Sequence, residues 1–266
     1  LYNAAIIFMV FVHTQRLAWL GVLVASLFGV APRMHAQAPV IVATNTTIRL
    51  MASNLSSGNN QRYEAPGLNI LKGLKPDVVA MQEFNYSSTK GNGINTTAAL
   101  REMIDDTFGT NFFYFRETGK SIPNGIISRF PILNSGVWDD PQLPDREFAW
   151  AQLELPGTND LYVVSVHLHS SGGSSSRSIE ATVLTNMIQT SFSANAFVVL
   201  AGDLNTDSRS EAALAKLTSI LSDTPIPTDA SSGGSPNTNQ NRNKPYDYVL
   251  PSFSLASNRV ATVIGS

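Results

Sequence analysis

The chain has 266 residues, of which 43% are hydrophobic and 14% are charged, and it contains no cysteine. These values indicate a globular α/β protein of one or two domains. The lack of cysteine excludes disulfides, thiolate-ligated zinc, iron–sulfur clusters and a cysteine nucleophile within this sequence. The formal net charge of −2 argues against binding of nucleic acid through a broad basic surface.

The first 36 residues have the pattern of a secretory signal peptide. An apolar run at 17–30 is preceded by Arg16 and followed by Pro32 and the small-residue stretch MHAQA. We expect residues 1–36 to be removed on export, which leaves a secreted or periplasmic protein without a membrane span. The alternative is an uncleaved leader that tethers the protein to a membrane, although this run is shorter than the roughly 20 residues that a span requires.

Residues 40–266 alternate short apolar runs with helical patterns. The first half predicts strands and helices in this order: strand 47–53, helix 65–74, strand 77–82 and helix 96–108. Five strands separated by turn residues follow, at 112–116, 125–130, 132–138, 148–155 and 161–166.

The second half returns to alternation of helix and strand. We expect a helix at 179–192, a buried strand at 196–201, a helix at 208–221, a polar loop at 228–244 and a strand at 246–250. Ser208 and Glu211 match a capping box at the start of the helix at 208–221. Runs of strands with helices on both sides predict two packed mixed sheets flanked by helices.

Several of the expected strands end in an acidic or amide side chain. Asn54 follows the strand at 47–53, and Glu83 follows the strand at 77–82. Asp203 and Asn205 follow the strand at 196–201, and residues two apart on a strand share a face. Asp247 lies inside the late strand. A buried cluster of this kind calls for a cation, and oxygen ligands favour Mg²⁺, Mn²⁺ or Ca²⁺.

Each of these residues also has an ordinary structural interpretation. A single Glu or Asn at the end of a strand is commonly a turn or surface residue, and Asp207 fits the start of a helix. His167 and His169 follow the strand at 161–166, and an isolated His167 fits a hydrogen-bonded core imidazole equally well. Taken one at a time, the residues do not identify a site.

Taken in order, the motifs do identify a family. PDVVAMQEFN, NGIISRFPI, DREFAWAQLEL, YVVSVHLHSS, VVLAGDLNTD and YDYVL together resemble the endonuclease/exonuclease/phosphatase superfamily, from about residue 46 to the end. DREFAWAQLEL looks most like the deoxyribonuclease I branch. The resemblance implies a four-layer α/β/β/α sandwich and metal-dependent hydrolysis of phosphate esters.

The resemblance also implies roles for individual residues. Glu83, Asn54 and Asp203 match the metal site, and Asn54 also supports the phosphate. Asp203 and Asn205 match a pair that orients the attacking water and holds a phosphate oxygen. The remaining matches are His167 to a histidine on the scissile phosphate, Arg146 to an arginine that grips phosphate, and Asp247 to an aspartate of the late strand. His169 has no counterpart, and we interpret it as a structural or rim residue.

One motif of the family is missing. Members carry a Ser-Asp-His triplet on a late strand, and the last 16 residues of this sequence contain neither His nor Asp. We therefore expect the sequence to be a fragment that lacks the C-terminal Ser-Asp-His segment, and we expect the polypeptide as written to have little activity.

The leading hypothesis is a secreted, nuclease-like phosphodiesterase that uses a Mg²⁺-activated water and acts on nucleic acid. One alternative is a phospholipid or sugar-phosphate phosphoesterase similar to sphingomyelinases. Another is a secreted binding domain on the same fold without catalysis. No protein partner is inferred from the sequence.

Overall fold

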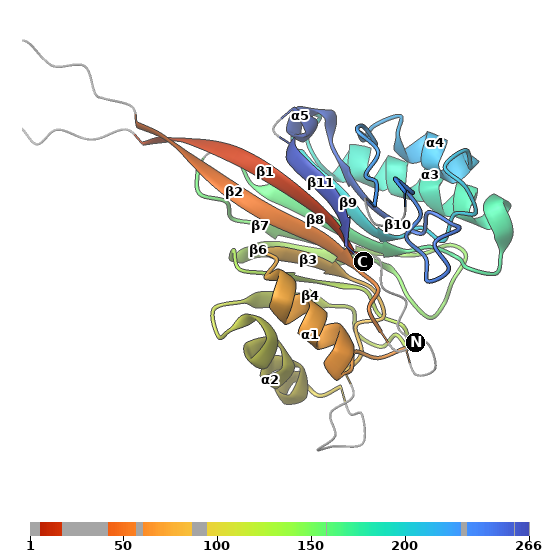
Figure 1. The fold of residues 1–266 in the computed structure, drawn as a ribbon, viewed down its shortest axis with the longest axis horizontal. Coiled ribbons are helices and arrows are strands. Elements are labelled where there is room, and N and C mark those ends of the chain that lie inside the picture. The colour runs from red at the N-terminus through yellow and green to blue at the C-terminus, as the bar shows by residue number, and fades with distance from the viewer. Residues whose placement is uncertain are drawn as a thin grey trace, which may run out of the picture.

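The structure is a computed structural model that describes residues 6–17, 42–56, 61–86, 95–157, 159–229, 233–257 and 259–265. Within these ranges the strands form two mixed sheets, which pack face to face and carry helices on their outer faces (Figure 1). This arrangement confirms the predicted four-layer sandwich.

The larger sheet has six strands in the spatial order β11 (Arg259–Gly265), β1 (Ile6–Leu17), β2 (Val42–Ser53), β3 (Val78–Met81), β5 (Gly125–Ser128) and β4 (Phe113–Arg116). The smaller sheet has five, in the order β10 (Asp247–Pro251), β9 (Phe197–Asp203), β8 (Leu161–His167), β7 (Phe148–Leu153) and β6 (Ile132–Trp138). The pairs β2–β3 and β8–β9 are parallel. Parallel neighbouring strands have their C-terminal ends on the same side of a sheet. In each sheet, the C-terminal ends of two neighbouring strands therefore lie close together.

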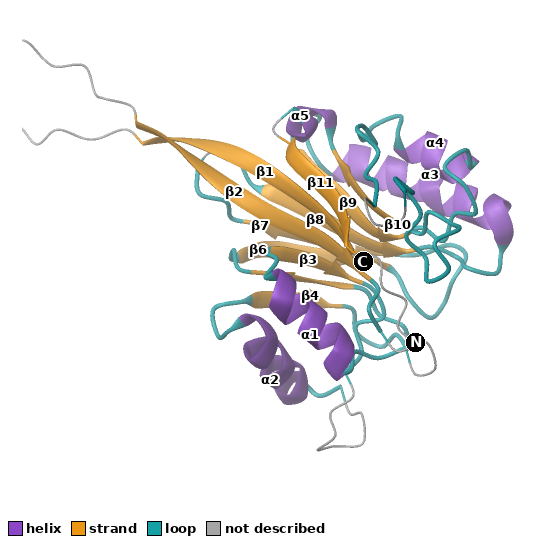
Figure 2. Ribbon diagram, viewed as in Figure 1, coloured by secondary structure: helices purple, strands orange, loops and turns teal. Residues whose placement is uncertain are grey.

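The helices divide between the two outer faces (Figure 2). Those on the six-stranded sheet are α1 (Ala65–Leu74) and α2 (Thr97–Phe108). Those on the five-stranded sheet are α3 (Gly173–Ser191) and α4 (Ala212–Leu217), and the short α5 (Phe253–Ala256) follows β10. Among these helices of the described ranges, none is long and apolar enough to cross a lipid bilayer.

Side-chain alternation along the central strands builds three cores. On β2, Leu50 and Ala52 face the other sheet, whereas Met51 packs with the helices α1 and α2. On β9, Val199 and Ala201 face the other sheet, and their neighbours pack with α3 and α4. Because both faces of these strands are buried, their sequences are continuous apolar runs without polar alternation.

Two of the predicted helices have wrong boundaries. α3 begins at Gly173, six residues before the expected start, and its first turns include the buried Arg177. α4 covers only Ala212–Leu217 of the predicted 208–221, and the capping box is not formed. The Glu211 carboxylate is bound instead by the Arg177 guanidinium and by the backbone N–H of Asp207. A buried ion pair has therefore replaced a local cap.

The predicted leader lies partly in the larger sheet. Its residues 6–17 form β1, which pairs antiparallel with both β2 and β11. Residues 1–5 and 18–36 of the leader lie outside the described residues. Removal of the leader on export stays a prediction.

Candidate active site

The ends of β8, β9 and β10 bring three predicted site residues into one row. His167 is the register partner of Asp203 across the parallel pair β8–β9, and Asp203 is the partner of Asp247 across the antiparallel pair β9–β10. Directly paired residues share a face of a sheet, so their side chains are neighbours. All three are buried, with at most 6% of their surface exposed.

The other sheet contributes Asn54, which follows the last residue of β2. Its amide Nδ2 donates a hydrogen bond of 3.0 Å to Oδ2 of Asp203. The imidazole Nε2 of His167 lies 3.8 Å from the same oxygen. The Asp203 carboxylate thus connects the strand ends of one sheet with the segment that follows β2 in the other sheet.

Glu83 follows β3 and has a positive φ of 51°. Its Oε2 accepts a hydrogen bond from the hydroxyl of Ser56, which also lies 3.5 Å from Oδ1 of Asn54. The carboxylate and amide oxygens of two neighbouring strands therefore face one hydroxyl. Gln82, the preceding residue, bonds to Ser165 Oγ at 3.0 Å and ties this segment to the second sheet.

The turn after β9 fixes the orientation of the Asp203 carboxylate. Asn205 has a φ of 50°, and its backbone N–H donates to Asp203 Oδ1 at 2.8 Å. Its side-chain Nδ2 donates to the carbonyl of Leu168 at 3.0 Å. At Gly202 a Cβ would lie 2.0 Å from the carbonyl oxygen of Val166, so this position of the Gly-Asp-Leu-Asn motif accepts only glycine.

Arg146 places a buried cation beside these groups. Its Nε donates to the backbone carbonyl of His167 at 2.7 Å, and its Nη1 lies 3.7 Å from Asp145. Only 5% of Arg146 is exposed. Since arginine remains protonated in proteins, it supplies a fixed positive charge at the site.

A cavity of about 310 Å³ collects these side chains. Six of the seven predicted site residues line it: Asn54, Glu83, Arg146, His167, Asp203 and Asn205. Asp247 lies next to Asp203 and is not one of the lining residues. Ser56, which stands two residues after Asn54, was not predicted from the sequence. His169 also lines the cavity, although no chemical role was predicted for it.

Burial is the main cause of the pKa shifts at four of the predicted site residues: Glu83, His167, Asp203 and Asp247. Burial raises the pKa of Glu83, and burial together with the charge of Glu83 raises the pKa of Asp203 to about 6. The pKa of Asp247 is raised well above its usual range by burial and by Asp203. Burial and the Arg146 cation hold the pKa of His167 well below its usual value, so the imidazole is neutral. Perturbed groups gathered in one cavity are typical of functional sites.

The donor set fits a hard divalent cation that keeps part of its water shell. Among the described residues, no three His, Asp or Glu side chains converge into a metal site. Mg²⁺ in enzymes is commonly held by one or two carboxylates, waters and substrate phosphates rather than by a full protein cage. Glu83 with the amide oxygen of Asn54 matches this arrangement. The raised pKa values of Glu83 and Asp203 show that their negative charges lack full compensation.

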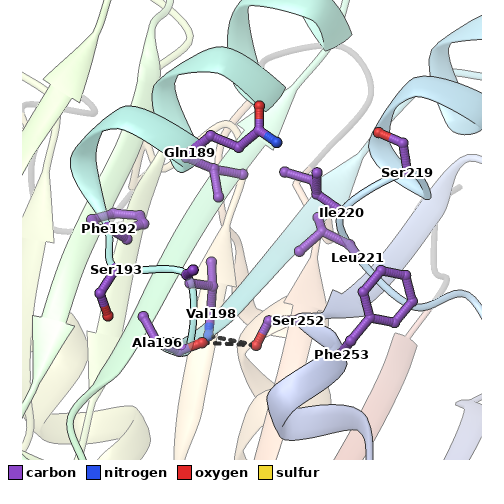
Figure 3. A pocket seen from close by; sticks show the side chains of 12 residues that line it. Gln189, Phe192, Ser193, Ala196, Val198, Ser219, Ile220, Leu221, Ser252 and Phe253 are labelled. Carbon is purple, nitrogen blue, oxygen red and sulfur yellow. Dashed lines mark hydrogen bonds between the residues drawn. The ribbon is translucent and has the colours of Figure 1, made fainter.

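A second, larger hollow of about 420 Å³ lies between the C-terminal end of α3 and the start of α5 (Figure 3). Its walls include Phe192, Ile220 and Phe253, and the Ser252 hydroxyl at its base donates to the carbonyl of Ala196 at 3.0 Å. No Asp, Glu, His, Lys or Arg is among its lining residues. This hollow therefore offers no charged side chain for acid–base or metal chemistry, in contrast to the first cavity.

Comparisons with known proteins agree with this fold. Residues 54–265 match the model of the family described as "Endonuclease/Exonuclease/phosphatase family". Several solved structures share the fold. Humanized D. rerio TDP2 with 14 mutations is 19% identical, the match covers 74% of this chain and 78% of that chain, and the TM-score is 0.53. A functionally unknown conserved protein from Enterococcus faecalis V583 is 12% identical (76% of this chain, 85% of that chain, TM-score 0.54), and beta toxin from Staphylococcus aureus is 13% identical (78% of this chain, 86% of that chain, TM-score 0.51). No curated protein sequence matches the chain significantly.

Proposed function

The chain belongs to the endonuclease/exonuclease/phosphatase family, and from this membership and the geometry of the cavity we propose that it is a metal-dependent phosphodiesterase. One observation carries the proposal: Asn54 from one sheet and His167 from the other both approach Oδ2 of Asp203 in a cavity that Glu83 also lines. Glu83, Asn54 and Asp203 would hold Mg²⁺, Mn²⁺ or Ca²⁺. When bound, such an ion supplies charge neutralisation at a phosphate oxygen and acidifies a bound water.

The chain's own donors would bind the substrate phosphate. Arg146 offers a buried guanidinium that stays protonated, and Asn205 retains one amide hydrogen after its bond to Leu168. His167 is neutral, so one of its ring nitrogens carries hydrogen and donates without adding charge. Donors held in place before substrate arrives stabilise charge that develops on phosphoryl oxygens during reaction.

Asp203 would orient the attacking water and accept its proton. A general base works best when its pKa lies near the working pH, and without a bound cation burial brings the pKa of Asp203 to about 6. Its Oδ1 is bound by the Asn205 backbone, so Oδ2 is the oxygen that faces Asn54 and His167. The pKa of Asp247, which is paired with Asp203, is raised well above its usual range by burial and by the charge of Asp203, so Asp247 would keep its proton while Asp203 acts as the base.

We propose that the substrate is nucleic acid and that the protein is exported. The substrate rests on the family resemblance of the motifs, and export rests on the signal-peptide pattern of residues 1–36. Because the chain is acidic, binding of a polyanion would depend on the bound cation and on Arg146 rather than on a basic surface.

The test uses the full-length protein and removes one charge at a time. Glu83→Gln and Asp203→Asn are each expected to lower kcat/KM for a DNA oligonucleotide by about 10²-fold or more, because they remove a cation ligand or a base. The exposed residues Glu154→Gln and Asp106→Asn are matched controls and should change nothing. Retention of activity by both site variants would overturn the assignment.

A second measurement defines the substrate. Release of nucleotides from DNA and RNA, phosphocholine from sphingomyelin, and inorganic phosphate from sugar phosphates is compared under one set of conditions. We expect nucleotide release to be fastest. Faster release of phosphocholine would assign the protein to the phospholipid alternative, and no release with any substrate would favour a binding domain.

A further inference from the structure

His169 is held at three of its own atoms although no role has been assigned to it. Its backbone N–H donates to both carboxylate oxygens of Glu180, at 3.0 and 3.1 Å. Its carbonyl accepts a hydrogen bond of 3.2 Å from Nη1 of Arg177. Both partners come from α3 and are fully buried, so the backbone of His169 is fixed by the helix that follows it.

The imidazole of His169 is fixed as well. Its Nδ1 accepts a hydrogen bond of 2.7 Å from the backbone N–H of Gly172. Gly172 also lies close to the ring, because a Cβ at that position would come within 2.8 Å of the ring atoms Cγ and Cδ2. With Nδ1 acting as an acceptor, the neutral ring carries its hydrogen on Nε2.

The same helix connects His169 to the turn after β9. Arg177 binds the Glu211 carboxylate with two hydrogen bonds of 2.9 and 2.7 Å, and it lies 3.2 Å from Asp207. Asp207 in turn pairs with Lys244 at 2.5 Å. His169 and the segment that follows β9 are therefore bonded to one buried guanidinium, which ties the two segments together.

Resting on the proposed function, we infer that His169 is a substrate-binding residue whose Nε2–H donates to an anionic oxygen of the phosphate ester. The ring lines the same cavity as Arg146 and Asp203, but it is half-buried where His167 is buried. It therefore binds the part of the ester nearer the mouth of the cavity. A donor that is already ordered loses little conformational entropy on binding, which is the advantage of the three anchoring contacts.

Two conservative substitutions separate this role from a structural one. His169→Asn keeps an acceptor near the position of Nδ1 for the Gly172 N–H, but it has no group at the position of Nε2. His169→Gln reaches that position with an amide N–H. In the full-length protein with bis(4-nitrophenyl) phosphate, we expect H169N to raise KM about tenfold with kcat nearly unchanged, the size expected for loss of one hydrogen bond to a charged group. H169Q should stay within about threefold of the unsubstituted KM.

Competitive inhibition by inorganic phosphate gives a second measurement, which reports binding of the phosphate group alone. Its inhibition constant should rise with H169N and return with H169Q, while the thermal unfolding midpoints of both variants match that of the parent. Gln189→Leu, an exposed change on the same helix, is the control. Unchanged KM in H169N, or an equal rise in both variants, would overturn the role of His169. If Glu83→Gln and Asp203→Asn abolish activity in the same assays, the proposed function stands whatever the outcome for His169.

Discussion

Asp203 and Asp247 lie directly opposite each other on the antiparallel strands β9 and β10, and only 6% and 5% of their surfaces are exposed. Burial raises the pKa of both carboxyls, and the charge of Asp203 raises that of Asp247 further. Within the described part of the chain, Oδ1 of Asp247 has no hydrogen-bond partner. Two opposed carboxyls in a dry site oppose folding, so their presence there indicates a function that outweighs stability.

The first prediction concerns this pair. Asp247→Asn removes one of the two opposed ionisable carboxyls and retains the side-chain volume. We expect the free energy of unfolding in EDTA at pH 7.5 to rise by about 1 kcal/mol, while phosphodiesterase activity falls. Urea denaturation of the variant and of the exposed control Asp106→Asn gives the comparison. A loss of stability in Asp247→Asn would mean that its carboxylate is compensated in the folded protein.

The second prediction concerns the cation. Mg²⁺ or Mn²⁺ in large excess over its dissociation constant should raise the free energy of unfolding by about 1–3 kcal/mol, because a ligand that binds only the folded state stabilises it by mass action. Chelation with EDTA should reverse the change. Glu83→Gln should remove most of the stabilisation, whereas Glu154→Gln should retain it. An equal stabilisation in both variants would place the ion at another site.

Much of the fold was predictable because the central strands are buried on both faces. β3, β5, β8 and β9 are continuous apolar runs in the sequence, and Pro, Gly and Asn residues mark the turns between them. The bounds of α1 agree with the prediction residue for residue. The prediction for α4 was wrong for a specific reason. The local sequence indicates that Glu211 caps a helix, but its carboxylate is bound by Arg177, 34 residues earlier.

The site divides in the same way. The strand ends named Asn54, Glu83, His167 and Asp203, and the parallel pairs β2–β3 and β8–β9 bring those ends together. Ser56 could have been noticed, because a residue two positions after Asn54 shares its side of an extended chain. The hydrogen bonds that hold the backbone of His169 could not have been predicted. They come from Glu180 and Arg177 of α3, and the start of this helix lies within a Gly/Ser run.

The third prediction tests the buried guanidinium that links the two loops of the site. Arg177→Met leaves the Glu211 carboxylate buried without its partner, which typically costs about 3–5 kcal/mol. Urea denaturation should show this loss, and Lys72→Met on the exposed side of α1 should change stability by less than about 0.5 kcal/mol. The double variant Arg177→Met/Glu211→Leu should recover much of the loss. No recovery would show that the His169 carbonyl and Asp207 are the contacts that matter.

The fourth prediction is a dependence of stability on pH that arises outside the cavity. Glu117 follows β4 and is 1% exposed, and burial raises the pKa of its carboxyl from 4.5 to about 8. Between these values the folded protein holds a proton that the unfolded chain has lost. The stabilisation is therefore complete below pH 4.5 and is lost as the pH rises toward 8, by at most about 1.4 kcal/mol per pH unit.

Glu117→Gln keeps the neutral form at every pH and removes this slope. We expect the variant and the parent to have similar stability near pH 5, and the variant to become progressively more stable up to pH 8. Urea denaturation at intervals of one pH unit measures the difference between the two proteins, in which the other buried carboxyls, such as Glu180 with its pKa of about 8, cancel. Glu154→Gln on the surface should give a difference that does not vary with pH. A flat difference for Glu117→Gln would show that its carboxylate is ionised and compensated in the fold. Its Oε1, which has no hydrogen-bond partner among the described residues, would then have one in solution.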